Sequence, residues 1–331
     1  MAEPKHFSLA GKRAVVTGGA GFLGRVVVRK LAERGCAEVA VPRRNSCDLR
    51  RLDDIARLLD AAQPDFVIHL AATVDDPAGR ADVASSFSDN VLMATQLIDA
   101  AARRGVAKMA VLGSASAYPA SAAMPLREED LFNGLPDASR LAHGIAKRLP
   151  VIHAYACRLQ YSFRCISLIP TNLYGPGDNF DAGTSYVIPS LVRRFVDAVE
   201  TGASEITLRG SGKASRDFLH VDDCAEGVLL ALERYDGLQP VNLGSGTEVK
   251  ISDLSLHVAR LAGYTGKILW DSRYPDGPPR RVLDTSRAQR EFGFRARRNL
   301  PDGLRETLDS YRSTRSRAEA CETIHALASR A

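Results

Sequence analysis

The stretch that decides the fold is RAVVTGGAGFLG, residues 13–24. It begins as a short apolar run and ends as a glycine series, and residues 22–35 continue with helical apolar spacing. A strand that passes through a tight glycine turn into a helix is typical of dinucleotide-binding sheets, because glycine permits close backbone approach and the helix N-terminus attracts a pyrophosphate. The residues expected to bind the dinucleotide at this turn are Gly18, Gly21, Phe22, Leu23 and Gly24.

The residues after the second apolar run, 37–41, indicate which dinucleotide is bound. An acidic side chain there would accept hydrogen bonds from the ribose of NAD(H), but the chain reads Pro42-Arg43-Arg44-Asn45. A guanidinium at this place suits a 2′-phosphate, which it can bind with two hydrogen bonds. Asp48 and Leu49 follow where a pair that contacts the adenine is common. The sequence therefore favours NADP(H) over NAD(H) as the cofactor.

Apolar runs alternate with helical patterns as far as Pro170. The runs cover 37–41, 66–70, 109–112 and 162–169, and the helical patterns include 52–61 and 91–104. This alternation predicts an α/β fold, a Rossmann doubly wound parallel sheet with helices on both faces. After Pro170 the chain is rich in Gly, Pro, Asp and Asn, and long loops of this kind usually carry function. We therefore predict a smaller α/β substrate-binding lobe beside the sheet.

The domain boundaries follow from this change of composition. We expect the NADP-binding Rossmann domain to comprise residues 1–170 and 218–249, and the substrate-binding lobe to comprise 171–217 and 250–312. The charged, alanine-rich residues 313–331 are expected to form an exposed C-terminal helix or tail.

Composition limits the class of protein. Of 331 residues, 45% are hydrophobic and 25% charged, as in ordinary globular chains. The six cysteines include no Cys-x-x-Cys pair, so we expect reduced thiols, no metal site and a cytoplasmic location. No signal peptide and no membrane-spanning run is recognised. The net charge is +5, but aromatic residues are only 6% and the arginines are dispersed, which favours a small polyanionic ligand over nucleic acid or a membrane.

Several longer motifs fall in a fixed order beyond the glycine turn. They are His69-Leu70-Ala71-Ala72, Asn90, the strand end at 112–119, the loop Pro170-Thr171-Asn172-Leu173-Tyr174-Gly175-Pro176, and the stretches at 187–195, 217–223 and 275–281. From about residue 12 to 312 the chain resembles the extended short-chain dehydrogenases/reductases, also called the NAD-dependent epimerase/dehydratase family. Within that family it is most similar to the GDP-L-fucose synthase group, which acts on GDP-4-keto-6-deoxy-mannose.

The resemblance implies a set of binding residues. For the cofactor, beside those given above, it implies Leu70, Ala71, Ala72, Asn90, Lys147, Pro170, Asn172 and Leu173. For a nucleotide-sugar, GDP-linked in that group, it implies Ser114, Ser116, Asn172, Val187, Arg194, Arg209, Arg216 and Arg281. Cationic side chains from separate loops suit the two phosphates of such a ligand. Arg209 replaces a tryptophan common in the family, so the surface that stacks on the base is expected to differ. The resemblance also implies a homodimer.

The positions that move protons in this family are changed here. Its Tyr-x-x-x-Lys pair places both side chains on one face of a helix, but this chain has His143 with Lys147. The family's epimerising cysteine and histidine correspond to Ser116 and Tyr186, while Ser114 is retained. Because the Lys147 ammonium should lower the pKa of His143, we expect a neutral imidazole that accepts a proton or binds a hydroxyl, and weakened reduction by the usual route.

Two of these groups, Tyr186 and His143, have two interpretations each. Tyr186 keeps an ionisable proton and could replace the missing acid, or it packs only. Ser116 is a weak base and is expected to bind the sugar by a hydrogen bond, while Ser114 could polarise a keto oxygen. His143 could also serve only in packing.

Three functions remain open from the sequence. The first is an NADP(H)-dependent epimerase/reductase-like enzyme acting on a GDP-(6-deoxy)-4-keto sugar, with histidine in place of the usual tyrosine. The second is an epimerase or dehydratase that uses tightly bound cofactor without net reduction. The third is a non-catalytic homologue that binds nucleotide-sugars.

Overall fold

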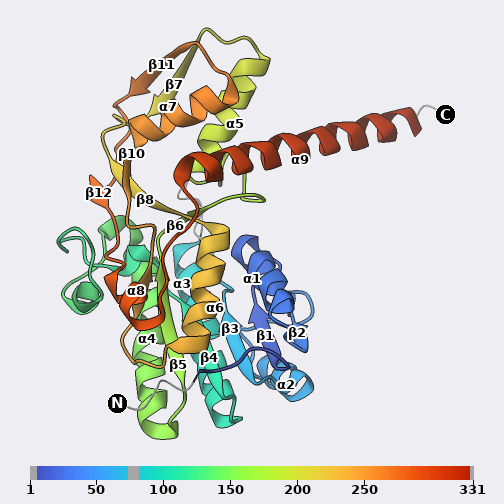
Figure 1. Cartoon of the computed structure of the whole chain (residues 1–331), viewed down its shortest axis with the longest axis vertical. Coiled ribbons are helices and arrows are strands. Elements are labelled where there is room, and N and C mark those ends of the chain that lie inside the picture. Colours follow the sequence, from blue (N-terminus) through green and yellow to red (C-terminus); the bar gives the residue numbers. More distant parts are fainter. Residues whose placement is uncertain (1–5, 74–81, 329–331) are drawn as a thin grey trace. The chain divides into compact units, whose positions relative to one another are not determined.

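The computed structural model describes residues 6–73 and 82–328, with side chains as far as residue 316. The described chain divides into two compact units, whose elements are labelled in Figure 1. The first unit holds the described residues up to Leu173 together with Asp217–Glu248 and Arg280–Arg297. The second unit holds Tyr174–Arg216, Val249–Pro279 and the described residues from Arg298 onward.

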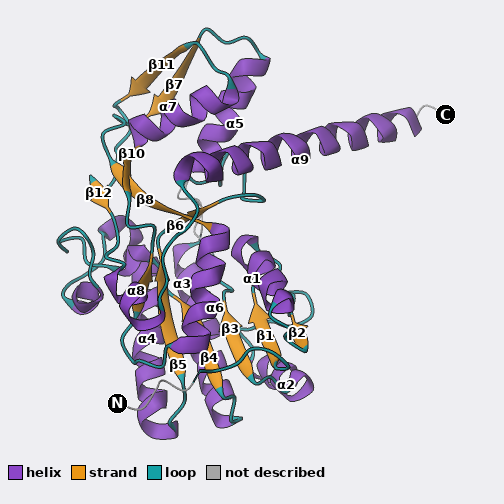
Figure 2. Cartoon of the chain, in the orientation of Figure 1, coloured by secondary structure: helices purple, strands orange, loops and turns teal. Residues whose placement is uncertain are grey.

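A six-stranded parallel sheet forms the centre of the first unit (Figure 2). Its strands are β1 (Arg13–Thr17), β2 (Glu38–Ala40), β3 (Phe66–His69), β4 (Lys108–Leu112), β5 (Cys165–Pro170) and β9 (Val241–Leu243). They stand in the order β2-β1-β3-β4-β5-β9. The predicted doubly wound parallel sheet is thereby confirmed. The strand order reverses between β1 and β3, and such switch points are where open α/β sheets bind ligands.

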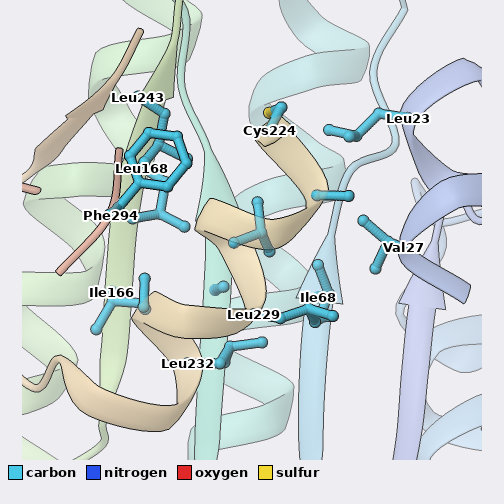
Figure 3. Close-up of a cluster of buried hydrophobic side chains, with 14 of the residues drawn as sticks. Leu23, Val27, Ile68, Ile166, Leu168, Cys224, Leu229, Leu232, Leu243 and Phe294 are labelled. Atoms are coloured by element: carbon cyan, nitrogen blue, oxygen red, sulfur yellow. The ribbon is translucent and has the colours of Figure 1, made fainter. Parts of the chain in front are cut away.

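Helices cover both faces of this sheet. Buried side chains of α1 (Phe22–Glu33), α6 (Val221–Arg234) and α8 (Ser286–Phe292) share one apolar cluster with the strands. Those of α2 (Leu52–Ala62), α3 (Val83–Arg103) and α4 (Leu141–Tyr161) share another. Figure 3 shows Val27, Ile68 and Leu229 among the side chains of the first cluster.

Alternate residues of each central strand enter different clusters. Val16 and Ile68 belong to the cluster with α1 and α6, whereas Val15 and Val67 belong to the cluster with α2 and α3. Because successive side chains of a strand point to opposite faces, both sets are buried only if both faces are covered. This is why the sequence shows unbroken apolar runs rather than alternation.

The second unit is built from α5 (Val187–Glu200), α7 (Ile251–Ala262) and α9 (Leu300–Ala328) with a parallel pair, β7 (Glu205–Arg209) and β11 (Lys267–Asp271). Phe195 of α5 is fully buried and packs against Tyr264, with ring centroids 5.5 Å apart. Helix α5 contacts both α7 and α9. The register of β7 with β11 places Arg209 opposite Asp271.

Four short strands pair with one another. Strand β8 (Ser215–His220) has β10 (Glu248–Lys250) and β12 (Arg280–Arg281) as neighbours, and it also pairs with β6 (Asn172–Tyr174).

The largest difference between the observed division of the chain and the expected boundaries lies in one segment. We placed 250–312 in the substrate lobe, but Arg280–Arg297 belongs to the first unit. The reason is apolar burial, because Phe292 and Phe294 are part of the cluster that α6 forms with the sheet. Backbone bonds from Leu126 N to Val282 O (2.8 Å) and from Asp284 N to Leu126 O (2.9 Å) hold the same segment. The expected boundary at 313 lies inside α9, which continues to Ala328.

Candidate active site

The glycine turn after β1 lies directly against the chain that leaves β3. Gly18 has φ +70°, and a Cβ built on it would be 2.7 Å from the backbone nitrogen of Ala71. Gly21 is the N-cap of α1 and has no side chain to occupy the helix N-terminus. A Cβ on Gly21 would meet only the carbonyl oxygen of Gly18 within 4 Å, at 3.2 Å. The turn therefore offers backbone and a positive helix end, which fits the pyrophosphate of a dinucleotide.

The chain after β2 carries the two arginines predicted to select the cofactor. Arg43 and Arg44 are exposed, and the carbonyl of Arg43 accepts hydrogen bonds from the backbone nitrogens of Ser46 (3.0 Å) and Cys47 (2.8 Å). These bonds close a turn at the end of the strand. Both arginines thus lie at a hydrogen-bonded turn that follows the edge strand β2.

Asp48, predicted to contact the adenine, is held by a residue that sequence reasoning missed. Arg50 donates to the Asp48 carboxylate from Nε (2.8 Å) and Nη2 (2.6 Å), and its Nη1 lies 3.2 Å from Asp89 on α3. These bonds from Arg50 hold the pKa of Asp48 far below its usual value. The carboxylate therefore stays ionised, and Arg50 links the loop after β2 to α3. Leu49 beside it is buried.

The Asn90 side chain braces the segment that leaves β3. Its Oδ1 accepts from the backbone nitrogen of Thr73 (2.9 Å), and its Nδ2 donates to the carbonyls of Thr73 (2.8 Å) and Ser86 (2.9 Å). Leu70, Ala71 and Ala72 lie just before this clamp. The geometry supports Asn90 as a residue that positions the cofactor-binding segment; direct contact with the cofactor stays a prediction.

Lys147 extends from α4 to the carboxyl ends of the central strands. Its Nζ donates to the carbonyl of Leu112, the last residue of β4, at 3.3 Å. Burial lowers the pKa of this lysine to about 8. The neighbouring His69 bonds Thr17 through Nδ1 and Oγ1 at 2.7 Å, and burial together with the Lys147 charge lowers its pKa to about 3. His69 is therefore a neutral imidazole that joins β3 to β1.

The loop that carries Ser114 and Ser116 packs closely against α4, the helix that carries His143. A Cβ on Gly144 would lie 2.6 Å from the carbonyl oxygen of Ser116, so only glycine permits α4 to approach this loop so closely. The Ser114 and Ser116 hydroxyl oxygens are 2.7 Å apart, and Ser114 Oγ also accepts from the backbone nitrogen of Ser116 at 3.2 Å. His143 is half-buried next to Gly144. The structure thus brings together four of the five predicted catalytic residues.

Residues after β5 are anchored by Asp217, a buried residue of the motif at 217–223 to which the sequence analysis assigned no role. Asn172 Nδ2 donates to the carbonyl of Asp217 at 2.9 Å, as does Thr171 Oγ1 at 3.1 Å. The Asp217 side chain is fully buried, and its Oδ1 accepts from the nitrogen (3.0 Å) and the hydroxyl (2.5 Å) of Ser245. Burial raises the pKa of Asp217. Pro170 and Leu173 flank this anchored segment.

Arg281 lies near the start of α4. Burial lowers its pKa, the carboxylate of Asp137 opposes that shift, and Arg140 adds to it. Tyr118, in contrast, has a structural place: it is buried, and its hydroxyl donates to Asn242 Oδ1 at 2.7 Å. Burial also raises the pKa of Tyr118, which makes it a poor source of protons.

The other predicted substrate residues belong to the second unit. Tyr186 is the N-cap of α5 with half its surface exposed, and Val187 begins the helix. On the same helix Arg194 donates to the carbonyl of Thr207 on β7. Arg216 is fixed through Nη1 to its neighbour Ser215 O (2.7 Å) and through Nη2 to Asp276 O (3.2 Å). Arg209 lies over the ring of Tyr274 with 4.6 Å from its Cζ to the ring centroid.

The described residues contain neither a cluster of metal-binding side chains nor a membrane-spanning helix. Among the described residues, no three His, Cys, Asp or Glu side chains are grouped so that they could hold a metal ion. The five cysteines with described side chains are free thiols, and the side chain of Cys321 lies outside the described part. None of the described helices combines the length and the apolar character that crossing a membrane requires.

Comparisons with known proteins show which family and which chains this one is similar to. Residues 14–244 match the model of the NAD dependent epimerase/dehydratase family. A probable GDP-L-fucose synthase 1 of Oryza sativa subsp. japonica is 37% identical over 94% of this chain and 95% of its own length. A GDP-L-fucose synthase of Sinorhizobium fredii is 36% identical over 92% and 97%. The crystal structure of a GDP-L-fucose synthetase from Naegleria fowleri bound to NADP has a TM-score of 0.87, with 25% identity over 96% and 97% of the two chains.

The lowered pKa of Lys147 gives a prediction about stability. Between pH 8 and 10.5 the unfolded chain, whose lysine has its ordinary pKa of 10.5, binds more protons than the folded chain, so stability should rise with pH. At pH 7, Lys147→Met should therefore unfold at a higher urea concentration than the parent, with a free energy of unfolding that is larger by about 2 to 3 kcal/mol. This gain in the free energy of unfolding should be smaller at pH 9.5. Lys147→Gln should show the same trend, because the effect comes from the charge. An equal gain at both pH values would contradict the assignment.

Proposed function

This chain belongs to the NAD-dependent epimerase/dehydratase family, and from that premise we propose that it is an NADP(H)-dependent enzyme acting on a GDP-linked 4-keto or 4-hydroxy sugar. The observation that carries the proposal is the meeting of Ser114, Ser116, His143 and Lys147 at the carboxyl edge of the sheet, beside a well-formed glycine turn. The relatives that span nearly the whole chain act as GDP-L-fucose synthases by name, which supports the GDP-sugar class.

The residues of the first unit fit the cofactor. Backbone at Gly18, Gly21 and Gly24 would hold the pyrophosphate, and Arg43 with Arg44 would hold the 2′-phosphate of NADP(H) through charge-assisted bonds. When bound, the cofactor would supply or accept a hydride. Lys147 already has its ammonium group at the end of β4, where it would bind the ribose as its counterpart does in the family.

The Ser114 and Ser116 pair would hold an oxygen atom of the sugar. The hydroxyls bond one another at 2.7 Å, so one proton of the pair is free to be donated to a substrate oxygen. His143 would accept or donate one further hydrogen bond, and a positive imidazolium at this place would be repelled by the Lys147 ammonium. The chain thus keeps the groups that bind and orient a sugar better than those that supply a proton.

The replacement of the family's proton-donating tyrosine by His143 also favours a second candidate function. An enzyme that oxidises the sugar transiently, then epimerises or dehydrates it and returns the hydride, needs no net proton delivery to a ketone. His143 as a neutral base suits this scheme. A non-catalytic nucleotide-sugar-binding homologue is the remaining alternative, and the activity assays below distinguish all three.

In the second unit Arg194 and Arg216 are proposed to bind the diphosphate. Arg194 is half-buried and its guanidinium is fixed at Thr207, and Arg216 is fixed at Ser215 and Asp276. Because these bonds hold each guanidinium in one place, little conformational entropy would be lost when a phosphate binds. Val187 and Tyr186 at the start of α5 are proposed to contact the sugar.

We also propose a homodimer that pairs α3 and α4 with the same helices of a second copy. Ile152, Tyr155 and Leu159 of α4 are 52%, 49% and 66% exposed, and they recur at helical spacing on one face. Leu92 of α3 is also exposed, at 40%, and α3 packs along α4. Apolar side chains grouped in this way are typical of an interface between subunits.

The cofactor assignment predicts a selective loss. Arg43→Ser with Arg44→Ser should weaken NADPH binding at least tenfold, because charge-assisted bonds to the 2′-phosphate are lost, and should leave NADH binding nearly unchanged. Arg57→Ser, which removes another exposed arginine, should alter neither. Fluorescence titration of both cofactors measures the effect. Equal weakening of NADPH and NADH would contradict the role of these arginines.

The catalytic proposal is tested by following NADPH absorbance and solvent deuterium entering the sugar ring, with GDP-4-keto-6-deoxy-mannose and related GDP-keto-hexoses and GDP-keto-heptoses. The parent should convert at least one of them, and His143→Tyr with Ser116→Cys and Tyr186→His should raise fucose-forming reduction, because the proton donors are restored. Lys147→Met in either background should lower the rate.

Deuterium exchange without net NADPH loss would favour the second candidate. Another outcome is a parent that gives neither signal with any of these sugars while the triple variant makes GDP-fucose. That result would support the third candidate, a non-catalytic homologue that binds nucleotide-sugars.

The dimer is tested by light scattering after size-exclusion chromatography. The parent should have twice the mass of the chain, and Ile152→Glu with Leu159→Glu should have the mass of one chain, because burying two carboxylates at the interface is costly. Leu256→Glu, at an exposed leucine of α7, should remain a dimer. A monomeric parent would contradict the proposal.

A further inference from the structure

Arg148 is a buried arginine of α4 that directly follows Lys147. Only 6% of its surface is accessible. Its Nε donates to the carbonyl of Ala117 at 2.5 Å, and its Nη1 donates to the carbonyl of Gly134 at 2.6 Å. Burial lowers the pKa of Arg148, and no carboxylate of the described residues opposes that shift. The guanidinium is therefore paired with two backbone carbonyls and not with an opposite charge.

A cation buried in this way is costly. Its removal from water is unfavourable unless an opposite charge accompanies it, and carbonyl dipoles replace only part of the lost hydration. The Nη2 of Arg148 is also buried without a hydrogen-bond partner among the described residues. Packing alone would therefore favour an apolar side chain at this position. What arginine adds is a pair of charge-assisted hydrogen bonds to two separate segments of the chain.

The same face of α4 makes a second contact with the loop that carries Ser114 and Ser116, here called the serine loop (residues 113–118). Gly144 lies one helical turn before Arg148, and residues four apart share a face. A Cβ on Gly144 would be 2.6 Å from the carbonyl oxygen of Ser116. Gly144 and Arg148 thus hold two successive carbonyl groups of the serine loop against α4.

The adjacent face of α4 carries His143 and Lys147, each one residue before the two that hold the serine loop. Both ends of the loop are also attached. Lys147 Nζ donates to the carbonyl of Leu112, just before the loop, at 3.3 Å. At the other end the Tyr118 hydroxyl donates to Asn242 Oδ1 at 2.7 Å. The buried guanidinium fixes the middle of the loop, at the residue that follows Ser116.

We propose that Arg148 is a positioning residue, which holds the serine loop against α4 and so sets the distance from the Ser114 and Ser116 hydroxyls to the Lys147 ammonium. The inference rests on the proposed function, which gives these groups their part in binding a sugar oxygen. Arg148 acts only through the backbone of Ala117. Its planar fork of donors holds two carbonyls at once, which the single ammonium of a lysine cannot do in the same geometry.

Steady-state kinetics of the full chain test the effect on the reaction, with NADPH and GDP-4-keto-6-deoxy-mannose or the related GDP-keto sugar that the parent converts. Arg148→Met should lower kcat at least tenfold and leave the KM for NADPH within about twofold, because the glycine turn at 18–24 is untouched. Arg148→Lys should lose less, because one bond is kept. Gly144→Ala should also lower kcat, because it displaces the same loop without removing a charge.

The matched control is another arginine of α4. Arg158 donates from Nη2 to the carbonyl of Asp236 at 2.9 Å, ten residues after Arg148 on the same helix. Arg158→Met removes a comparable bond between a guanidinium and a carbonyl, and it should leave kcat and the KM for NADPH within about twofold of the parent.

Hydrogen–deuterium exchange of the protein without ligands tests the position of the loop independently of activity. The Ala117 nitrogen donates to the Ser114 carbonyl (2.9 Å), and the Ala120 nitrogen donates to the Leu135 carbonyl (3.0 Å). Arg148→Met should raise amide exchange at least tenfold in peptides that cover 113–120 and 133–136, and should leave α1 unchanged. A general loss of stability would raise exchange in all of these peptides.

The outcomes separate this inference from the proposed function. If Arg148→Met keeps the kcat of the parent, or if exchange in the serine loop does not change, the positioning role is overturned and the proposed function stands. A rise in exchange that is equal throughout the chain also overturns the role, because it shows that Arg148 serves stability only. A parent that converts none of the sugars overturns the enzymatic proposal, and the exchange measurement then decides by itself whether Arg148 holds the loop.

Discussion

The contact on which the candidate active site depends is the close approach of the turn after β1 to the segment after β3. The backbone of Gly18 leaves no room for a Cβ against Ala71, the Leu70 nitrogen donates to the Thr17 carbonyl at 3.0 Å, and the Thr17 hydroxyl bonds His69. These contacts fix the end of β1 to the end of β3 at the point where the strand order reverses. The N-terminus of α1 and the segment braced by Asn90 take their positions from them.

The charged groups at the same edge of the sheet limit which proton transfers are possible there. Lys147 keeps its place at the end of β4 although burial lowers its pKa, and a neutral His69 lies close by. A tyrosine at position 143 would share this edge as a neutral acid, whereas a protonated histidine would add a second positive charge. Under the proposed function, histidine at this position would keep the fold and the binding surfaces and change the transfer of protons.

In the second unit, too, the backbone that positions the arginines is distinct from the side chains that would recognise a ligand. The backbone of β7 and β11, with the glycines that follow β7, holds Arg194 and Arg209 in position. Which ligand is recognised depends on the side chains placed on that frame. An arginine stacked on Tyr274 gives this unit a positively charged flat surface.

The sequence by itself determined the parallel sheet, the glycine turn, the two arginines after β2, and the retained Lys147 beside the altered His143. Each of these depends on periodicity or on short spacing, which a linear chain records directly. Only the tertiary structure decided that Arg50 holds Asp48, that Asp217 anchors Asn172, that Arg280–Arg297 packs with the first unit, and that Arg209 meets Tyr274. The physical reason is that most of these contacts join segments tens of residues apart. Their partners are chosen by packing and by the pairing of strands, neither of which leaves a repeating signal in the sequence.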